Sequence, residues 1–167
     1  MRPAGTTTAT TAALAALLPD RHLVIRTAWL YGPDPERRNF ALRCVDRLAA
    51  GEQIRVPADQ WGNPTYTEDV ARATRLLVGR GEAGIVHASG PECVDRVTVA
   101  QKVCARFGLD PGGIVPTPTR ALGQAAPRPL RVELDDTKLR GLGAPAFRGL
   151  EAGLQALWSW DAAPAKR

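Results

Sequence analysis

Three separate segments of this 167-residue sequence carry the side chains best suited to binding a ligand. Trp29 and Trp61 each offer a flat apolar surface with one N–H donor. Arg128 stands between Pro127 and Pro129, which restrict its backbone, and a guanidinium can hold a phosphate through two parallel hydrogen bonds. A solvated arginine is an equal alternative at this position. These residue types therefore predict a site for a polar or anionic ligand.

Acid–base, nucleophilic and metal chemistry find no comparable support. His22 and His87 fall in separate expected strands, and no Ser/His/Asp or Cys/His arrangement can be drawn from the sequence. Cys44, Cys93 and Cys104 are odd in number and lack Cys-x-x-Cys spacing, so they predict neither a disulfide framework nor a zinc site. We expect them to be small core residues in a reducing cytoplasm. We expect no catalytic residue and no metal site.

The composition favours one globular domain. The chain is 44% hydrophobic, enough to bury a core, and 167 residues are too few for two ordinary domains. The net charge is +5, and nearly all of the basic residues are arginines, because the only lysines are Lys102, Lys138 and Lys166. The arginines are scattered rather than gathered in a stripe, and no run of about 18 apolar residues exists. We therefore expect neither nucleic acid nor a membrane as a partner.

Strands and helices are expected to alternate along the chain. Apolar runs predict strands at residues 22–30, 53–56, 84–89 and 114–116. Helical spacing predicts helices at residues 9–18, 39–50, 97–107 and 147–158, a helix that opens at Thr67, and a short turn at 134–139. This alternation is typical of the α/β class.

Thr67 is expected to be the N-cap of its helix, with Glu68 and Asp69 in the first turn, where the helix dipole favours acids. The face of this helix toward the core is then expected to carry Val70, Thr74 and Leu77 or Val78.

Four segments have the order and spacing of a known enzyme family. They are residues 24–32 (VIRTAWLYG), 39–40 (NF), 59–71 (DQWGNPTYTEDVA), and 126–129 (APRP) followed by 134–139 (LDDTKL). Together they resemble the extended short-chain dehydrogenase/reductase superfamily, and most of all its dTDP-4-dehydrorhamnose reductase branch. Each segment alone is a weak signal, but four in order are specific. Trp29 and the DQWG run favour the reductase branch over the epimerases.

The resemblance implies the C-terminal portion of a Rossmann-type extended short-chain dehydrogenase: its last parallel strands and a small α/β substrate-binding subdomain. Within it, residues 1–19 are expected to be poorly ordered or a short helix. Residues 20–160 would form a single sugar-nucleotide-binding domain, and 161–167 a tail.

Family members use NADPH or NADH, held by a glycine-rich loop between a strand and a helix. No GxGxxG or GxxGxxG occurs here, and the GRGEAG run at residues 79–84 lies in the wrong order, after a helix and before a strand. The family's acid is the Tyr of a Tyr-x-x-x-Lys pair upstream of Arg26, where residues 1–25 contain neither Tyr nor Lys. The resemblance thus implies a truncated reductase-like protein that binds no nicotinamide cofactor by itself.

The family's substrate residues can be carried over where the motifs match. Trp29 and Tyr31 would lie beside a bound dTDP-sugar, although Trp29 could equally be a core residue at the end of a strand. Asn39 would offer its amide to the diphosphate or the sugar, but Asn is also among the best helix N-caps.

The other two segments complete the expected site. Gln60, Trp61 and Thr65 would form its second wall, and Arg128 would bind the diphosphate.

Three functions remain open for such a chain. The first is an incomplete enzyme of deoxysugar biosynthesis that keeps the substrate side. The second is a non-enzymatic binding or regulatory subunit of the same fold, with a protein partner on its exposed apolar surface. The third is one half of a two-chain reductase.

Overall fold

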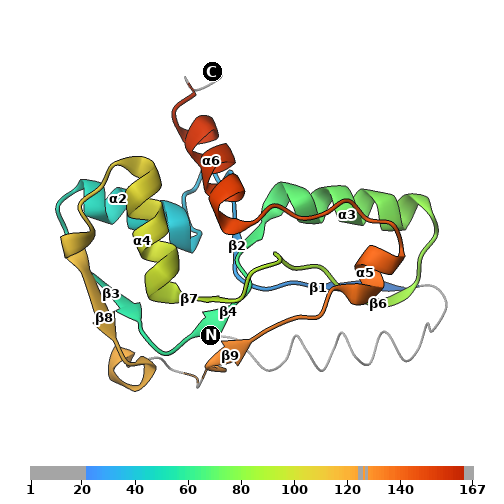
Figure 1. Cartoon of the computed structure of the whole chain (residues 1–167), viewed down its shortest axis with the longest axis horizontal. Coiled ribbons are helices and arrows are strands. Elements are labelled where there is room, and N and C mark those ends of the chain that lie inside the picture. Colours follow the sequence, from blue (N-terminus) through green and yellow to red (C-terminus); the bar gives the residue numbers. More distant parts are fainter. Residues whose placement is uncertain (1–21, 124–125, 127, 164–167) are drawn as a thin grey trace.

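A computed structural model describes residues 22–123, 126 and 128–163 of the chain (Figure 1). The expected N-terminal element at residues 1–19 lies outside the described residues, as does the end of the expected tail at 164–167.

Helices and strands alternate along the described chain, which confirms the α/β class. In order they are β1 (Leu23–Arg26), β2 (Leu30–Tyr31), α2 (Phe40–Ala49), β3 (Ile54–Pro57), β4 (Trp61–Gly62), β5 (Thr65–Tyr66), α3 (Thr67–Gly79), β6 (Gly84–His87), β7 (Val94–Asp95), α4 (Arg96–Phe107), the 3-10 turn η1 (Pro111–Gly113), β8 (Ile114–Thr117), the 3-10 turn η2 (Thr119–Leu122), β9 (Arg131–Val132), α5 (Thr137–Gly141) and α6 (Leu150–Asp161).

The strands form small sheets that are mostly parallel. β1 pairs with β6, β2 with β5 and β3 with β8, each in parallel. β4 lies between antiparallel β7 and parallel β9. In Figure 1 the β1–β6 pair lies below α3, while β3 and β8 lie beneath α2 and α4 at the other end of the molecule.

The prediction of a single strand at residues 22–30 is wrong, because the extended conformation is interrupted between β1 and β2. Ala88 N–H donates to the carbonyl of Arg26 at 2.8 Å, and the pairing with β6 ends there. Trp29 then adopts a positive φ of 43°, which a strand does not allow. The chain leaves one sheet and joins another, so β2 pairs with β5.

α3 differs from expectation at its first turn and in its buried face. Thr67 is the first helical residue and Tyr66 precedes it as the cap, without a side-chain capping bond. The buried positions are Asp69, Ala73 and Leu77. Leu77 is the correct one of the two expected alternatives, because Val78 is 64% exposed, whereas Asp69 and Ala73 take the places expected for Val70 and Thr74. The helix can bury Asp69 because its carboxylate accepts hydrogen bonds from Arg148 N–H at 2.7 Å and from the Arg72 guanidinium at 2.6 Å.

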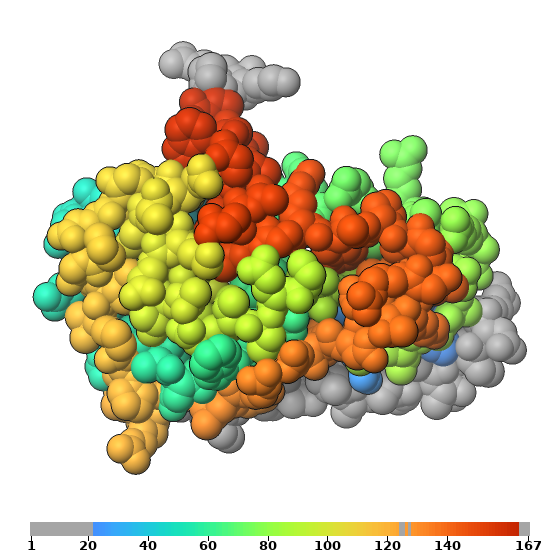
Figure 2. Space-filling model, in the orientation of Figure 1, coloured from blue at the N-terminus to red at the C-terminus, as the bar shows by residue number. Residues whose placement is uncertain are grey.

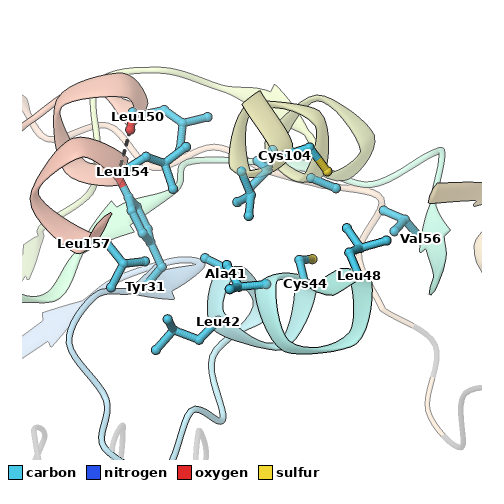
Figure 3. Packing of buried hydrophobic residues seen from close by; sticks show 14 of the residues in the cluster. Tyr31, Ala41, Leu42, Cys44, Leu48, Val56, Cys104, Leu150, Leu154 and Leu157 are labelled. Atoms are coloured by element: carbon cyan, nitrogen blue, oxygen red, sulfur yellow. Dashed lines mark hydrogen bonds between the residues drawn. The ribbon is translucent and has the colours of Figure 1, made fainter. Parts of the chain in front are cut away.

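Two apolar clusters form the core. The larger cluster packs α2, α4 and α6 around β3 and Tyr31 (Figure 3), and Figure 2 shows α4 and α6 in contact at the surface. The smaller cluster packs α3 and α5 against β1 and β6. Cys44 and Cys104 are buried in the larger cluster, as expected, whereas Cys93 is partly exposed.

Candidate functional site

A cavity of about 710 Å³ opens at the carboxyl end of β1. Ligands of parallel α/β proteins characteristically bind at this end of the strands. The walls come from the segment after β1, the start of α2, β3, the first residue of α4 and the 122–132 loop; they include Thr27, Ala28, Trp29, Leu30, Phe40, Arg43, Arg55, Pro57, Gln60, Arg96, Leu122, Arg128, Pro129 and Val132.

Trp29 is fixed in the wall by its backbone and by the strand beneath it. Its positive φ is costly for a residue with a large side chain, and such strain concentrates at functional sites. Its carbonyl accepts a hydrogen bond from Thr65 N–H at 3.2 Å. The indole covers Gly62, where an added Cβ would lie 2.7 Å from Cε2 of the ring. Gly62 is therefore required for the indole to lie flat against β4.

Arg96 covers the Trp29 ring. Its Cζ lies 3.7 Å from the centroid of the Trp29 ring and 4.8 Å from that of Phe40, so the guanidinium stacks on two aromatic rings. Asp95 caps α4 by accepting from Thr98 N–H at 2.9 Å, which sets the start of the helix and the position of Arg96. Burial, together with the nearby positive charges of Arg128 and Arg43, lowers the pKa of Arg96 to about 10.

Four arginines face the cavity without a carboxylate partner. Arg43, Arg55, Arg96 and Arg128 line it, no acidic residue is among its lining residues, and none of the four makes an ion pair within the described ranges. Among the described residues, Arg55 donates to the Ala121 carbonyl, at 2.7 Å. By contrast, carboxylates hold Arg37, Arg38, Arg47, Arg72, Arg106, Arg131, Arg140 and Arg148. The cavity is thus a concentration of positive charge that suits a polyanion.

A hydrogen-bonded loop closes one side of the cavity. Gln60 is buried in the wall, and its Nε2 donates to Thr119 Oγ1 at 3.1 Å. Asp59 accepts from Thr119 N–H at 2.9 Å and from its hydroxyl at 2.5 Å, and these bonds lower the pKa of Asp59. A second hollow of about 480 Å³ lies against this loop, and Arg128 lines both.

Of the residues expected in the site, the structure brings Trp29, Gln60 and Arg128 together in one cavity. Tyr31 is not among the lining residues. Its ring is 4% exposed and packs edge-on to Tyr66 with centroids 5.6 Å apart. Its hydroxyl donates to the Leu150 carbonyl at 3.3 Å (Figure 3), and burial raises its pKa well above the ordinary value.

Three more predicted residues lie outside the cavity lining. Asn39 is the N-cap of α2: its Oδ1 accepts from Leu42 N–H at 3.2 Å, and its Nδ2 donates to the Gly32 carbonyl at 3.0 Å. Thr65 is fully buried and bonded within the protein. Trp61 is 42% exposed on a neighbouring surface. The capping alternative for Asn39 is therefore confirmed.

Sequence reasoning missed Phe40, Arg43, Arg55 and Arg96. Phe40 and Arg43 are three residues apart on α2, so they share one face, and that spacing could have revealed them. Nothing in the sequence next to Arg96 predicts its stacking on two rings from other elements.

Neither a metal site nor a membrane-spanning helix is found within the described ranges. No group of three or more His, Cys, Asp or Glu side chains that could hold a metal ion occurs there. None of the helices described is long and apolar enough to cross a membrane.

Comparison with known proteins decides the family. A family model described as the RmlD substrate binding domain matches residues 5–159. The chain belongs to this family. The match covers the cavity walls, and the expected resemblance to the dTDP-4-dehydrorhamnose reductase branch is confirmed.

Curated relatives include reductases of dTDP-linked sugars. The chain is 38% identical over 134 residues to a probable dTDP-4,6-dihydroxy-2-methyloxan-3-one 4-ketoreductase of Streptomyces antibioticus, covering 79% of this chain and 44% of that protein. It is 33% identical over 151 residues to a dTDP-4-keto-6-deoxy-D-glucose reductase of Streptomyces niveus, covering 90% and 48%. The chain thus spans about half the length of the curated relatives it matches.

Solved structures agree with this assignment. The dTDP-4-dehydrorhamnose reductase of Bacillus anthracis, solved in complex with NADP, is 25% identical with a TM-score of 0.83, covering 93% of this chain and 54% of that one. The orthologue from Clostridium acetobutylicum shares the fold at 23% identity, with a TM-score of 0.85 and coverage of 95% and 55%.

Proposed function

We propose that this chain binds a dTDP-linked sugar in the arginine-lined cavity and serves as the substrate-binding side of a reductase of deoxysugar biosynthesis. The observation that carries the proposal is the group of four arginines around Trp29, none of them ion-paired in the described part of the chain. The family and the names of its relatives point to the same class of ligand.

Each wall of the cavity has a part in this proposal. Trp29 lines the cavity, and because Gly62 and Arg96 already cover the faces of its indole, we place the sugar against the remaining edge of the ring. Arg128, which lines both hollows, binds the diphosphate in this proposal. Gln60 holds Thr119, the first residue of η2, through a hydrogen bond to its hydroxyl.

The family's nicotinamide cofactor does not fit the described residues. The glycine-rich run at residues 79–84 leaves the end of α3 and leads into β6, so it presents no helix N-terminus to a phosphate. We therefore propose that this chain alone binds no nicotinamide cofactor, and we assign no hydride-transfer step to it.

The acid of the reduction is not found among these residues either. Tyr31 and Tyr66 are the only two tyrosines of the sequence, and both are buried in the core. Burial raises the pKa of each hydroxyl, and neither tyrosine lines the cavity. A general acid must reach the atom that it protonates. We propose that reduction needs a cofactor-binding unit with its own acid, supplied by residues outside these 167.

Isothermal titration calorimetry tests the proposal. The chain is titrated with dTDP, with a dTDP-sugar and with thymidine as the uncharged control. We expect saturable binding of both diphosphates and much weaker binding of thymidine, because the arginines act on the phosphates. An absence of heat with millimolar dTDP and dTDP-sugar would overturn the proposal.

A further inference from the structure

Arg96 is held in a fixed position before any ligand binds. Its backbone N–H donates to the Gln60 carbonyl at 3.1 Å, and its guanidinium lies between the rings of Trp29 and Phe40. Asp95 fixes the first turn of α4 just before it. A side chain restrained in this way loses little conformational entropy when it binds a ligand.

The described residues supply no counter-charge to Arg96. The nearest acid along the chain, Asp95, has both carboxylate oxygens bonded to Thr98, at 2.9 Å to its N–H and 2.6 Å to its hydroxyl. Arg96 makes no ion pair within the described residues, and Arg43 and Arg128 add positive charge to the same cavity. An unpaired charge that is partly removed from water is costly, so Arg96 is a site prepared for an anion.

A second polar group in the same wall also lacks a partner. Thr27 lines the cavity, and its hydroxyl oxygen is buried without a hydrogen-bond partner within the described ranges. Buried polar atoms are nearly always bonded in native proteins. The Arg96 guanidinium and the Thr27 hydroxyl thus lie in one wall, and among the described residues the first lacks an anion and the second lacks a hydrogen bond. Such a pair is typical of a site in which the ligand supplies the missing partners.

We infer that Arg96 is a phosphate-binding residue of the cavity, which uses the charge stacked on Trp29 to favour a nucleoside diphosphate over a monophosphate. The inference deepens the proposed function and rests on it for the nucleotide, but the anion site itself rests on Arg96. The guanidinium stacks on the Trp29 ring, so a diphosphate bound to it lies next to the ring edge proposed for the sugar.

The test compares Arg96→Met with the matched control Arg75→Met. Methionine keeps a flexible side chain that can still pack on the two rings. Arg75 is exposed on α3, outside both hollows, so its substitution removes the same charge from a distant surface. Binding of thymidine, dTMP, dTDP and inorganic pyrophosphate is measured by calorimetry, and the melting temperature by circular dichroism.

We expect Arg96→Met to weaken dTDP and pyrophosphate about 10- to 100-fold, the usual effect of losing charge-assisted hydrogen bonds. Thymidine binding is unchanged, and the ratio of dTDP to dTMP affinity falls. The melting temperature does not fall, because an unpaired charge has been removed from a site with few water contacts. Arg75→Met binds every ligand as the wild type does.

The outcomes separate this inference from the proposed function. If Arg96→Met binds dTDP as the wild type does, or weakens all nucleotides alike while its melting temperature drops, Arg96 is structural and the inference is wrong. If the wild type binds pyrophosphate but not dTDP, the nucleotide-sugar function is wrong while the anion site stands. If it binds neither, both are overturned.

Discussion

Replacing Gly62 with alanine should damage the site through Trp29. An added Cβ would lie 2.7 Å from Cε2 of Trp29 and 3.0 Å from two further ring atoms. The ring cannot easily retreat, because Arg96 covers it. Overpacking of this kind costs about 1–3 kcal/mol, and the lower entropy of the unfolded alanine chain returns about 0.4–1 kcal/mol. We therefore expect a net loss of about 1–2 kcal/mol in the free energy of unfolding.

The assays are urea unfolding and thermal unfolding, both followed by circular dichroism, and dTDP binding is measured on the same protein. A loss of that size lowers the melting temperature by about 2–4 °C per kcal/mol for a domain of this length. We expect dTDP to bind more weakly as well, because Trp29 and the arginine stacked on it are displaced.

Gly79→Ala is the matched control for Gly62→Ala. An added Cβ at Gly79, the last residue of α3, meets no atom within 4 Å, and alanine is the better helix former. This variant should be as stable as the wild type or slightly more stable. Our explanation of the Trp29 wall would be refuted if Gly62→Ala unfolded and bound dTDP like Gly79→Ala.

Three further predictions concern the fold and the loop. Asn39→Ala should lower the free energy of unfolding by about 1 kcal/mol in urea titrations, because it removes the cap of α2; an unchanged midpoint would show that the cap is dispensable. Leu154→Ala, at a fully buried position of α6, should cost about 2–5 kcal/mol by the same measurement, and a loss below 1 kcal/mol would contradict the core packing. Hydrogen bonds from Thr119 lower the folded-state pKa of Asp59, so its ionised form stabilises the fold above the unfolded pKa of about 3.9, and that stability is lost as the pH falls through the folded pKa. Asp59→Asn should therefore reduce the decline of the melting temperature below about pH 4, and a decline equal to that of the wild type would argue against this bond.

Local signals were enough to predict several helices. The Asn39 cap, and the period that follows it, place α2 within one residue of its observed bounds. Gly108 ends α4 in the left-handed conformation expected of a helix stop.

The errors came from contacts between distant residues. The phase of α3 depends on Asp69, whose carboxylate accepts from Arg148 N–H at 2.7 Å and from Arg72 at 2.6 Å. Arg148 lies 79 residues away, so no local pattern could place Asp69 in the core. The break in the first strand depends on the left-handed backbone of Trp29, which the sequence around it does not require.

Contacts between distant residues also limited how much of the site could be predicted. Motif resemblance identified Trp29, Gln60 and Arg128, which line the cavity. It also nominated Tyr31, which in this fold points into the core to reach the Leu150 carbonyl. Arg96 was missed because its role depends on two rings supplied by other elements.

Binding of a dTDP-sugar against Trp29 can be followed by NMR. The sequence has four tryptophans, Trp29, Trp61, Trp158 and Trp160, whose indole N–H signals can be assigned by single substitution to phenylalanine. During titration with a dTDP-sugar, we predict that the Trp29 signal shifts saturably, while the signals of Trp158 and Trp160, on α6 and outside the cavity lining, stay in place. Saturable binding that leaves the Trp29 signal unmoved would contradict the account.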